Sequence, residues 1–166
     1  DTLVLDMDAP LANPFKGLRA FQEADAPDFF GRAALTERLL ERMAEPGELS
    51  RFLAVVGPSG SGKSSAVRAG LVPALRQGGL PGAERWFIVE MQPGAQPQRE
   101  LATALLRVAT NPPKRLLERL QSDPQSLRRL VPRILPLEPE VELVVVIDQF
   151  EELFTLASDE ATRAHL

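Results

Sequence analysis

The sequence predicts an α/β fold, a three-layer α/β/α sandwich on a mainly parallel sheet. Short apolar segments alternate with longer segments of helical periodicity, which is typical of a parallel sheet covered by helices. A glycine-rich stretch joins the first apolar segment directly to a helix. The last apolar segment, residues 141–147, is apolar nearly throughout, as strands covered on both faces are.

Composition fits this class and excludes several others. Hydrophobic residues make up 44% and charged residues 25% of the 166 residues, which is ordinary for a soluble globular protein. The formal net charge of −4 argues against a dedicated nucleic-acid surface. Without cysteine, disulfides and thiolate metal sites are excluded. No apolar run reaches the roughly 18 residues that span a bilayer, and no signal peptide opens the chain, so we expect a cytoplasmic protein.

The first half supplies four expected elements. Residues 1–14, with Pro10 and Pro14, are interpreted as a linker or lead-in to a domain over residues 15–166. Residues 33–43 repeat leucine and methionine at helical spacing, and Pro46-Gly47 ends that helix. Residues 52–56 form a short apolar run, predicted to be a buried strand, and residues 63–75 a helix.

The second half continues the alternation. Residues 86–91 are predicted to be a strand, followed by helices over residues 98–108 and 113–120. Asp123-Pro124 predicts the start of another helix over residues 125–131, which Pro132 would kink or end. Residues 160–166 are predicted to be a helix without a terminating glycine or proline. We therefore expect a domain that continues beyond the strand at residues 141–147 and is incomplete at Leu166.

A phosphate-binding loop of the pattern G-x-x-x-x-G-K-[ST] follows the first strand. Its glycines allow successive backbone N–H groups to point into one cavity, and the following helix adds its positive end. Lys63 would reach the β- and γ-phosphates, and Ser64 would coordinate Mg²⁺. The candidate nucleotide-contacting residues are Gly57, Pro58, Ser59, Gly60, Ser61, Gly62, Lys63, Ser64 and Ser65.

The metal and the attacking water need acidic groups elsewhere in the chain. Asp148 ends the strand at residues 141–147, where a carboxylate is costly to bury without a partner, so it is the predicted Mg²⁺ ligand. Gln149 follows it, and glutamine is a poor base. Glu151 and Glu152 lie three and four residues past Asp148, and either could orient or deprotonate water. Lys63, Glu151 and Glu152 are therefore the candidate catalytic residues.

Three segments together resemble one family. They read NPFKGLRAF with DFFGR, FLAVVGPSGSGKSS, and VVVIDQFEELF. The combination resembles the P-loop NTPase domain of the bacterial STAND class, of the novel STAND NTPase 1 type often found with WD40 repeats. The resemblance implies Walker A and Walker B motifs at the loop and at Asp148. It also implies a signalling switch that binds ATP or GTP with Mg²⁺ and hydrolyses it slowly.

The resemblance also implies partners and a base-proximal segment. It implies a C-terminal sensor, an N-terminal effector and homo-oligomerisation on activation. Phe30, Gly31 and Arg32 resemble the part of these proteins that packs on the adenine, although Ala33 stands where relatives often have glutamate. Core packing is the alternative role for Phe29 and Phe30. The family's next strand would lie beyond Leu166, so residues 1–166 alone are expected to bind nucleotide weakly and to hydrolyse it poorly.

Three alternatives remain open. A transport or repair ATPase would couple hydrolysis to mechanical work, but residues 127–140 contain no L-S-G-G-Q signature. A nucleotide kinase would need a lid, and the arginine-rich residues 115–133 better fit the solvated faces of two helices. A nucleotide-gated scaffold would bind without turnover.

Overall fold

A computed structural model describes residues 16–17, 19–47, 51–123, 125–136, 138 and 141–156. The linker expected at residues 1–14 and the helix expected at residues 160–166 lie outside these residues. The chain divides into two compact units, Asp1–Pro73 and Ala74–Leu166. In the described residues, no helix is long and apolar enough to cross a membrane.

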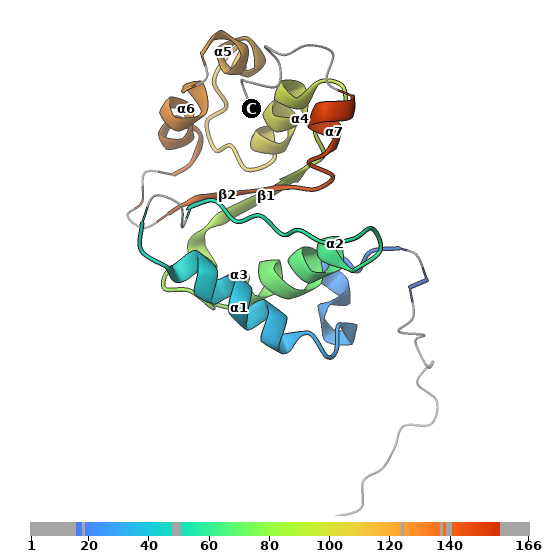
Figure 1. Ribbon diagram of the computed structural model, residues 1–166. Coiled ribbons are helices and arrows are strands. Elements are labelled where there is room, and N and C mark those ends of the chain that lie inside the picture. Colours follow the sequence, from blue (N-terminus) through green and yellow to red (C-terminus); the bar gives the residue numbers. More distant parts are fainter. Residues whose placement is uncertain are drawn as a thin grey trace, which may run out of the picture. The chain divides into compact units, whose positions relative to one another are not determined.

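The first unit is built on helices that pack around the helix after the glycine-rich loop (Figure 1). A 3₁₀ helix, η1 (Glu23–Asp28), precedes α1 (Ala33–Ala44), which confirms the predicted first helix within one residue. The loop leads into α2 (Lys63–Ser65), the π-helical η3 (Ala66–Leu71) and α3 (Val72–Arg76). The helix predicted over residues 63–75 therefore begins at Lys63 as expected. Its middle part, residues 66–71, is a π-helix, which has more residues per turn than an α-helix.

Pro73 gives a physical reason for the wide turn. A proline inside a helix has no N–H to donate and its ring crowds the carbonyl four residues earlier. Here the N–H of Val72 donates to Val67 O, five residues back, which is the π-helical pattern. The helix thus continues through the proline and does not end before it.

Gly70 lets η1 and α1 approach η3 closely. A Cβ placed on Gly70 would lie 2.7 Å from Thr36 Oγ1 in α1 and 3.4 Å from Cε1 of Phe29. Gly70 is itself buried, as are Ala66 and Ala69 on the same helix. Small residues on η3 therefore set the packing distance in this unit.

Replacing Gly70 by alanine should lower the free energy of unfolding. Alanine normally favours a helix by up to about 1 kcal/mol over glycine, but the overlap with Thr36 is expected to cost about 1–3 kcal/mol. Chemical denaturation would measure the change. In a Thr36→Ala background, which removes the crowded oxygen, the same substitution should cost much less. An equal change in the free energy of unfolding on Gly70→Ala in both backgrounds would contradict the close approach.

The strand predicted at residues 52–56 is not formed. Figure 1 draws this stretch as a coil that leads to α2, and in the described residues the sheet consists of β1 and β2 alone. Phe52 is 68% exposed and Val56 88% exposed, so the prediction of a buried strand was wrong. An apolar, β-prone segment becomes a strand only when a neighbour pairs with its backbone, and in the part of the chain described here it has no such partner.

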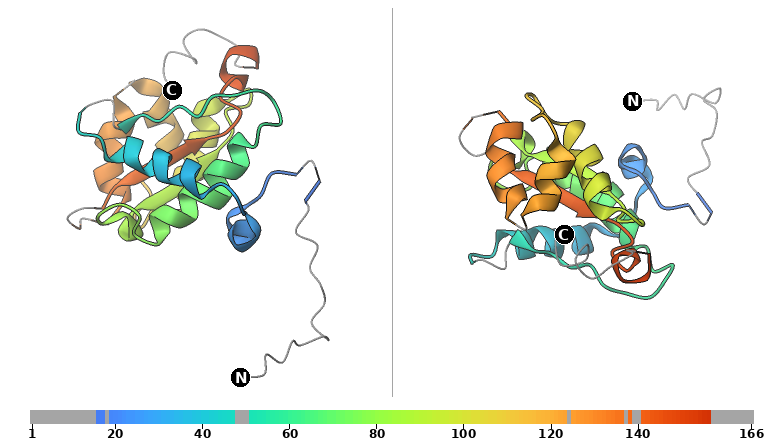
Figure 2. Two further views of the ribbon diagram at one scale, coloured as in Figure 1. Left: turned by 60° about the horizontal axis from the view of Figure 1, so that its bottom comes forward. Right: turned by 90° about the horizontal axis from the view of Figure 1, so that it is seen from above.

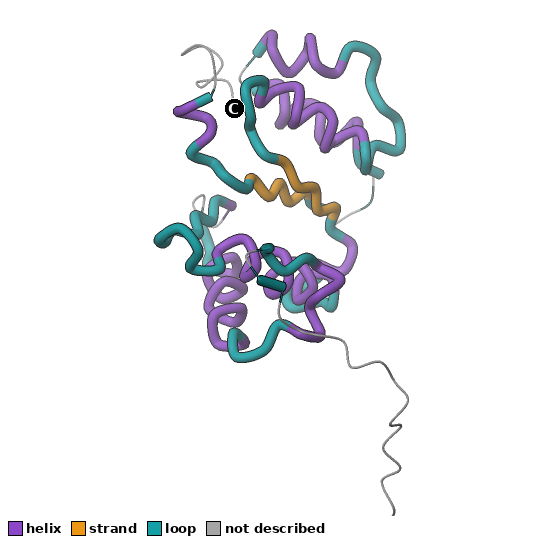
Figure 3. The backbone as a smooth tube through the Cα atoms, turned by 90° about the vertical axis from the view of Figure 1, so that its right-hand side faces the viewer, coloured by secondary structure: helices purple, strands orange, loops and turns teal. Residues whose placement is uncertain are grey.

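The second unit contains a parallel pair of strands (Figure 3). β1 (Phe87–Met91) follows the short 3₁₀ helix η4 (Ala83–Arg85) and pairs with β2 (Leu143–Ile147), with Phe87 opposite Leu143. Both strands lie inside the predicted ranges, and their parallel direction was expected. β2 is half-buried at every position, however, so it is not the fully covered strand that its composition indicates.

Three helices cover one face of this sheet (Figure 2). They are α4 (Pro97–Leu106), α5 (Leu116–Ser122) and α6 (Ser126–Ile134). Val89 and Met91 of β1 form one apolar cluster with residues of these helices, among them Leu105 and Ile134, which are fully buried. The chain thus forms a mixed α/β structure whose apolar core in this unit lies between the helices and the strands.

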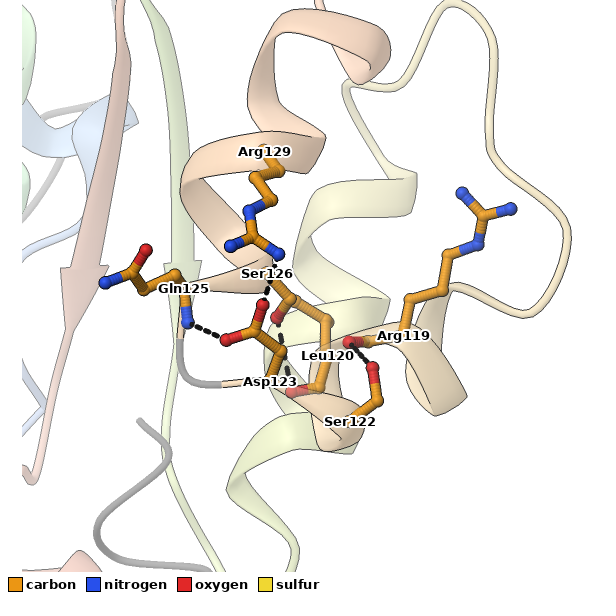
Figure 4. Close-up of polar contacts among 7 residues, drawn as sticks. All are labelled: Arg119, Leu120, Ser122, Asp123, Gln125, Ser126 and Arg129. Carbon is orange, nitrogen blue, oxygen red and sulfur yellow. Dashed lines mark hydrogen bonds and ion pairs between the residues drawn. The ribbon is translucent and has the colours of Figure 1, made fainter.

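The junction between α5 and α6 explains two boundaries (Figure 4). Asp123 Oδ1 accepts a hydrogen bond from the backbone N–H of Gln125 at 2.9 Å. Asp123 Oδ2 accepts a hydrogen bond from Arg129 Nη1 at 2.6 Å. Asp123 therefore contacts the start of α6, but Gln125 is the N-cap and the helix begins at Ser126, so the prediction of Asp123 as the N-cap was wrong. The helix continues past Pro132 to Ile134, so the proline does not end it.

Helix α5 begins later than predicted for a different reason. Arg115 adopts φ 59°, a left-handed conformation that excludes it from the helix, and α5 starts only at Leu116. The arginines of this region are exposed, and all of them except Arg115 lie on α5 or α6, as the interpretation of solvated helix faces requires. They are Arg115, Arg119, Arg128, Arg129 and Arg133.

Candidate functional site

The glycine-rich loop of the first unit has the backbone that its glycines permit. Gly60 has φ 75° and Gly62 φ 88°, both in the left-handed region where a side chain is strained. Ser61 N–H donates to Pro58 O at 3.2 Å and closes a turn within the loop. The loop residues 57–62 are exposed, so the loop is accessible to a ligand.

Lys63 folds back over the loop. Its Nζ donates to Gly57 O at 2.9 Å and to Pro58 O at 3.0 Å. An ammonium group has three donors, so these two contacts fix its position and leave one N–H for an acceptor outside the loop. Lys63 is half-buried, which restricts the rotamers that its aliphatic side chain can adopt.

The loop also presents unpaired backbone donors. Ser59, Gly60, Gly62 and Lys63 donate their backbone N–H groups to no backbone carbonyl of the described residues. Backbone N–H groups gathered before a helix, beside an ammonium group, form a site that favours an anion with several oxygen atoms. The donor set therefore fits a chain of phosphates.

Ser65 is engaged by a distant part of the chain. The backbone N–H of Phe21 donates to Ser65 Oγ at 3.1 Å, across 44 positions of sequence. The sequence placed Ser65 among the nucleotide-contacting residues and gave no sign of this bond. A contact between a backbone N–H and a hydroxyl so far apart leaves no pattern in one sequence, so nothing in the residues could have indicated it.

The N-terminal segment before α1 is held together by a second set of contacts. Lys16 Nζ lies 3.1 Å from Asp25 Oδ1, and the backbone N–H of Gln22 donates to Asp25 Oδ2 at 2.9 Å. The bond from Gln22, followed by that from Lys16, holds the pKa of the Asp25 carboxyl below its usual value. Asp25 is therefore a structural acid of this segment.

Phe29 and Phe30 differ in their surroundings. The ring of Phe29 lies 5.6 Å from that of Phe21, centroid to centroid, and also faces Gly70, so Phe29 packs within the unit. Phe30 is 78% exposed. Core packing, the role considered for both residues, therefore holds for Phe29 and not for Phe30.

Gly31 and Arg32 follow Phe30 at the start of α1. Gly31 has φ 74°, and Arg32 is the residue from which α1 begins, since its carbonyl accepts the N–H groups of Leu35 and Thr36. The Arg32 side chain is exposed and pairs with no carboxylate of the described residues. A cation is disfavoured at a helix N-terminus, so an unpaired guanidinium there is available to an anion or a polar ligand.

Asp148 belongs to the second unit and directly follows β2. Its backbone N–H donates to Met91 O at 3.0 Å, which extends the ladder by one residue, and its Oδ1 accepts the N–H of Gln149 at 3.0 Å. Gln149 has φ 54°, unusual for a residue with a side chain. The strand therefore ends in a tight turn that fixes the backbone at Asp148.

The two candidate glutamates have different environments. Glu152 starts the short helix α7 (Glu152–Thr155) and its Oε2 accepts the N–H of Gly94 at 3.0 Å, which ties α7 to the loop after β1. Glu151 is exposed and makes no side-chain hydrogen bond with the described residues. The structure thus gives Glu152 a structural contact that the sequence did not predict, and leaves Glu151 accessible.

The described residues contain no cluster of three or more acidic or histidine side chains that would hold a metal alone. Magnesium bound with a nucleotide does not require one, because it uses one or two protein oxygens together with phosphate oxygens and water. The Ser64 hydroxyl and the Asp148 carboxylate are oxygen ligands of the kind it prefers. Both residues therefore fit Mg²⁺ by their chemistry.

Comparison with known families gives a match over nearly the whole chain. The family model described as novel STAND NTPase 1 matches residues 14–166. Neither the curated proteins nor the solved structures that were compared gave a match. The chain belongs to the novel STAND NTPase 1 family, and membership implies a P-loop fold and nucleotide binding.

Proposed function

We propose that this member of the novel STAND NTPase 1 family binds ATP with Mg²⁺ through the loop at residues 57–64 and hydrolyses it slowly as a signalling switch. The observation that carries the proposal is the exposed glycine-rich loop, in which Lys63 is held by Gly57 O and Pro58 O beside backbone N–H donors. These groups match the charge and the hydrogen-bonding capacity of a polyphosphate.

The remaining roles follow from residue chemistry. Ser64 and Asp148 supply oxygen ligands for Mg²⁺, which neutralises charge on the phosphates when it is bound. Phe30 offers an exposed ring for the base, and Arg32, two residues later, an exposed guanidinium that pairs with no carboxylate of the described residues. Glu151 orients or deprotonates the attacking water, and Lys63 stabilises the charge that develops on the phosphates.

The switch interpretation extends beyond these residues. It includes a C-terminal sensor, an N-terminal effector and homo-oligomerisation on activation. The NTPase domain itself would be a three-layer α/β/α sandwich. A nucleotide-gated scaffold without turnover is the second candidate, and Gln149 favours it, because glutamine directly after Asp148 is a poor base.

A titration with and without Mg²⁺ tests the proposal. Mg²⁺ should tighten ATP binding by the protein, and Asp148→Asn should remove most of this gain because the amide is a weaker, uncharged ligand; we expect a loss of roughly 10-fold. Calorimetry would measure both affinities. Asp123→Asn is a matched control, since this half-buried aspartate contacts Gln125 and Arg129 at the start of α6.

Two outcomes would contradict the proposal. If the wild-type protein binds no nucleotide, the function is wrong. If ATP binds but Asp148→Asn retains the whole gain from Mg²⁺, then Asp148 is not the metal ligand.

A further inference from the structure

We propose that Ser65 is a positioning residue, which holds the N-terminal segment of residues 21–32 on the P-loop helix and thereby sets affinity for the base and sugar of the nucleotide. The inference rests on the nucleotide binding proposed above. It assigns Ser65 a role that differs from a direct phosphate contact.

The bond between Phe21 and Ser65 is the first support. Ser65 is the last residue of α2 and lies two residues after Lys63, and its Oγ accepts the backbone N–H of Phe21 at 3.1 Å in a half-buried environment. A partly buried N–H that loses its acceptor is left unsatisfied, so this bond is costly to break. It therefore fixes the backbone at Phe21 relative to the phosphate-binding loop.

The packing around this bond is the second support. The ring centroids of Phe21 and Phe29 are 5.6 Å apart, and Phe29 lies against Gly70, five residues after Ser65 on the same helix. The segment is thus attached to the P-loop helix at two points, by a hydrogen bond at Phe21 and by ring packing at Phe29.

The consequence concerns the residues that come next. Phe30 directly follows Phe29 and is 78% exposed, and Gly31 turns the chain into α1. Because Phe30 has little packing of its own, its position depends on the attachment of Phe21 and Phe29. A ring that is held in place before binding loses less conformational entropy when a base stacks on it.

The competing role is a phosphate contact, since a hydroxyl that accepts one hydrogen bond can still donate another. The two roles differ in what they affect. A phosphate contact contributes equally to the affinity for ATP and to the affinity for inorganic tripolyphosphate. A positioning role contributes to the affinity for ATP alone.

Titrations of the protein with Mg²⁺-ATP and with tripolyphosphate separate these roles. Ser65→Ala should weaken ATP binding roughly three- to tenfold, the range expected for one hydrogen bond, and leave tripolyphosphate binding unchanged. Ser65→Thr, which keeps the acceptor, should restore ATP affinity. Ser122→Ala is the matched control, a helical serine whose hydroxyl donates to Arg119 O at 2.9 Å.

Two further measurements make the test independent of a single variant. Phe29→Leu removes the ring contact without touching the phosphate loop, and should also weaken ATP binding selectively. In the nucleotide-free protein, hydrogen exchange at the Phe21 amide should be faster in Ser65→Ala than in the wild type and in Ser122→Ala.

The outcomes are distinguishable. If the wild type binds neither ligand, the proposed function fails. If both ligands bind and Ser65→Ala weakens them equally, or leaves ATP binding and Phe21 exchange unchanged, the positioning role is overturned while nucleotide binding stands.

Discussion

Replacing Lys63 by alanine should weaken Mg²⁺-ATP binding about 100-fold. The Lys63 ammonium is already held by Gly57 O at 2.9 Å and Pro58 O at 3.0 Å, so its remaining donor is fixed before a phosphate arrives. A charge-assisted hydrogen bond contributes about 1.5–3 kcal/mol, and the attraction between the ammonium and the phosphate charges adds to it. A calorimetric titration would measure the loss.

The same substitution should leave stability nearly unchanged. The carbonyls of Gly57 and Pro58 belong to exposed residues, so water can replace the ammonium, and we expect a change within about 0.5 kcal/mol. This separates a loss of binding from a loss of folding. Lys114→Ala is the matched control, because Lys114 is exposed and belongs to the second unit. Equal ATP affinity of Lys63→Ala and the wild type would contradict the assignment of the loop.

Lys63→Arg tests whether the position of the donor matters in addition to its charge. Arginine keeps the charge, but its guanidinium is planar and wider and cannot donate to two adjacent carbonyls and a phosphate in the same way as a compact ammonium. We therefore expect this variant to bind ATP more weakly than the wild type. Full retention of affinity would mean that charge alone, and not the position of the donor, decides binding.

The sequence predicted the elements that depend on local patterns. The helix α1 and the strands β1 and β2 lie within two residues of the expected ranges, because apolar periodicity and flanking proline and glycine determine them. The glycine-rich loop was also predicted, and Gly60 and Gly62 adopt the left-handed angles that only this residue tolerates easily.

The failures concern features that depend on distant partners. Residues 52–56 have the composition of a buried strand, but a strand also needs a neighbour, which composition does not reveal. The bond from Phe21 to Ser65 and the bond from Gly94 to Glu152 join residues 44 and 58 positions apart, respectively. Such contacts distinguish Glu152 from Glu151, which the sequence treated alike. They also distinguish Phe29 from Phe30, for both of which core packing was considered.

The pair of glutamates gives the second large prediction. Glu151→Gln should lower steady-state phosphate release about 100-fold, the lower part of the range for a lost general base, while ATP affinity stays within about twofold. Glu151 is exposed and makes no side-chain hydrogen bond with the described residues, so it is accessible to a water molecule. Phosphate release by the purified protein, measured at saturating ATP, would test this.

Glu152→Gln is the matched control for the preceding substitution. Glutamine keeps an oxygen that can accept the N–H of Gly94, so the contact between α7 and the loop after β1 should survive with little loss of phosphate release. Glu152→Ala removes the acceptor and should cost about 1 kcal/mol of stability. The reverse order, with Glu152→Gln inactive and Glu151→Gln active, would make Glu152 the base. A wild-type protein that binds ATP but releases no phosphate would instead be the nucleotide-gated scaffold, in which neither glutamate has a catalytic role.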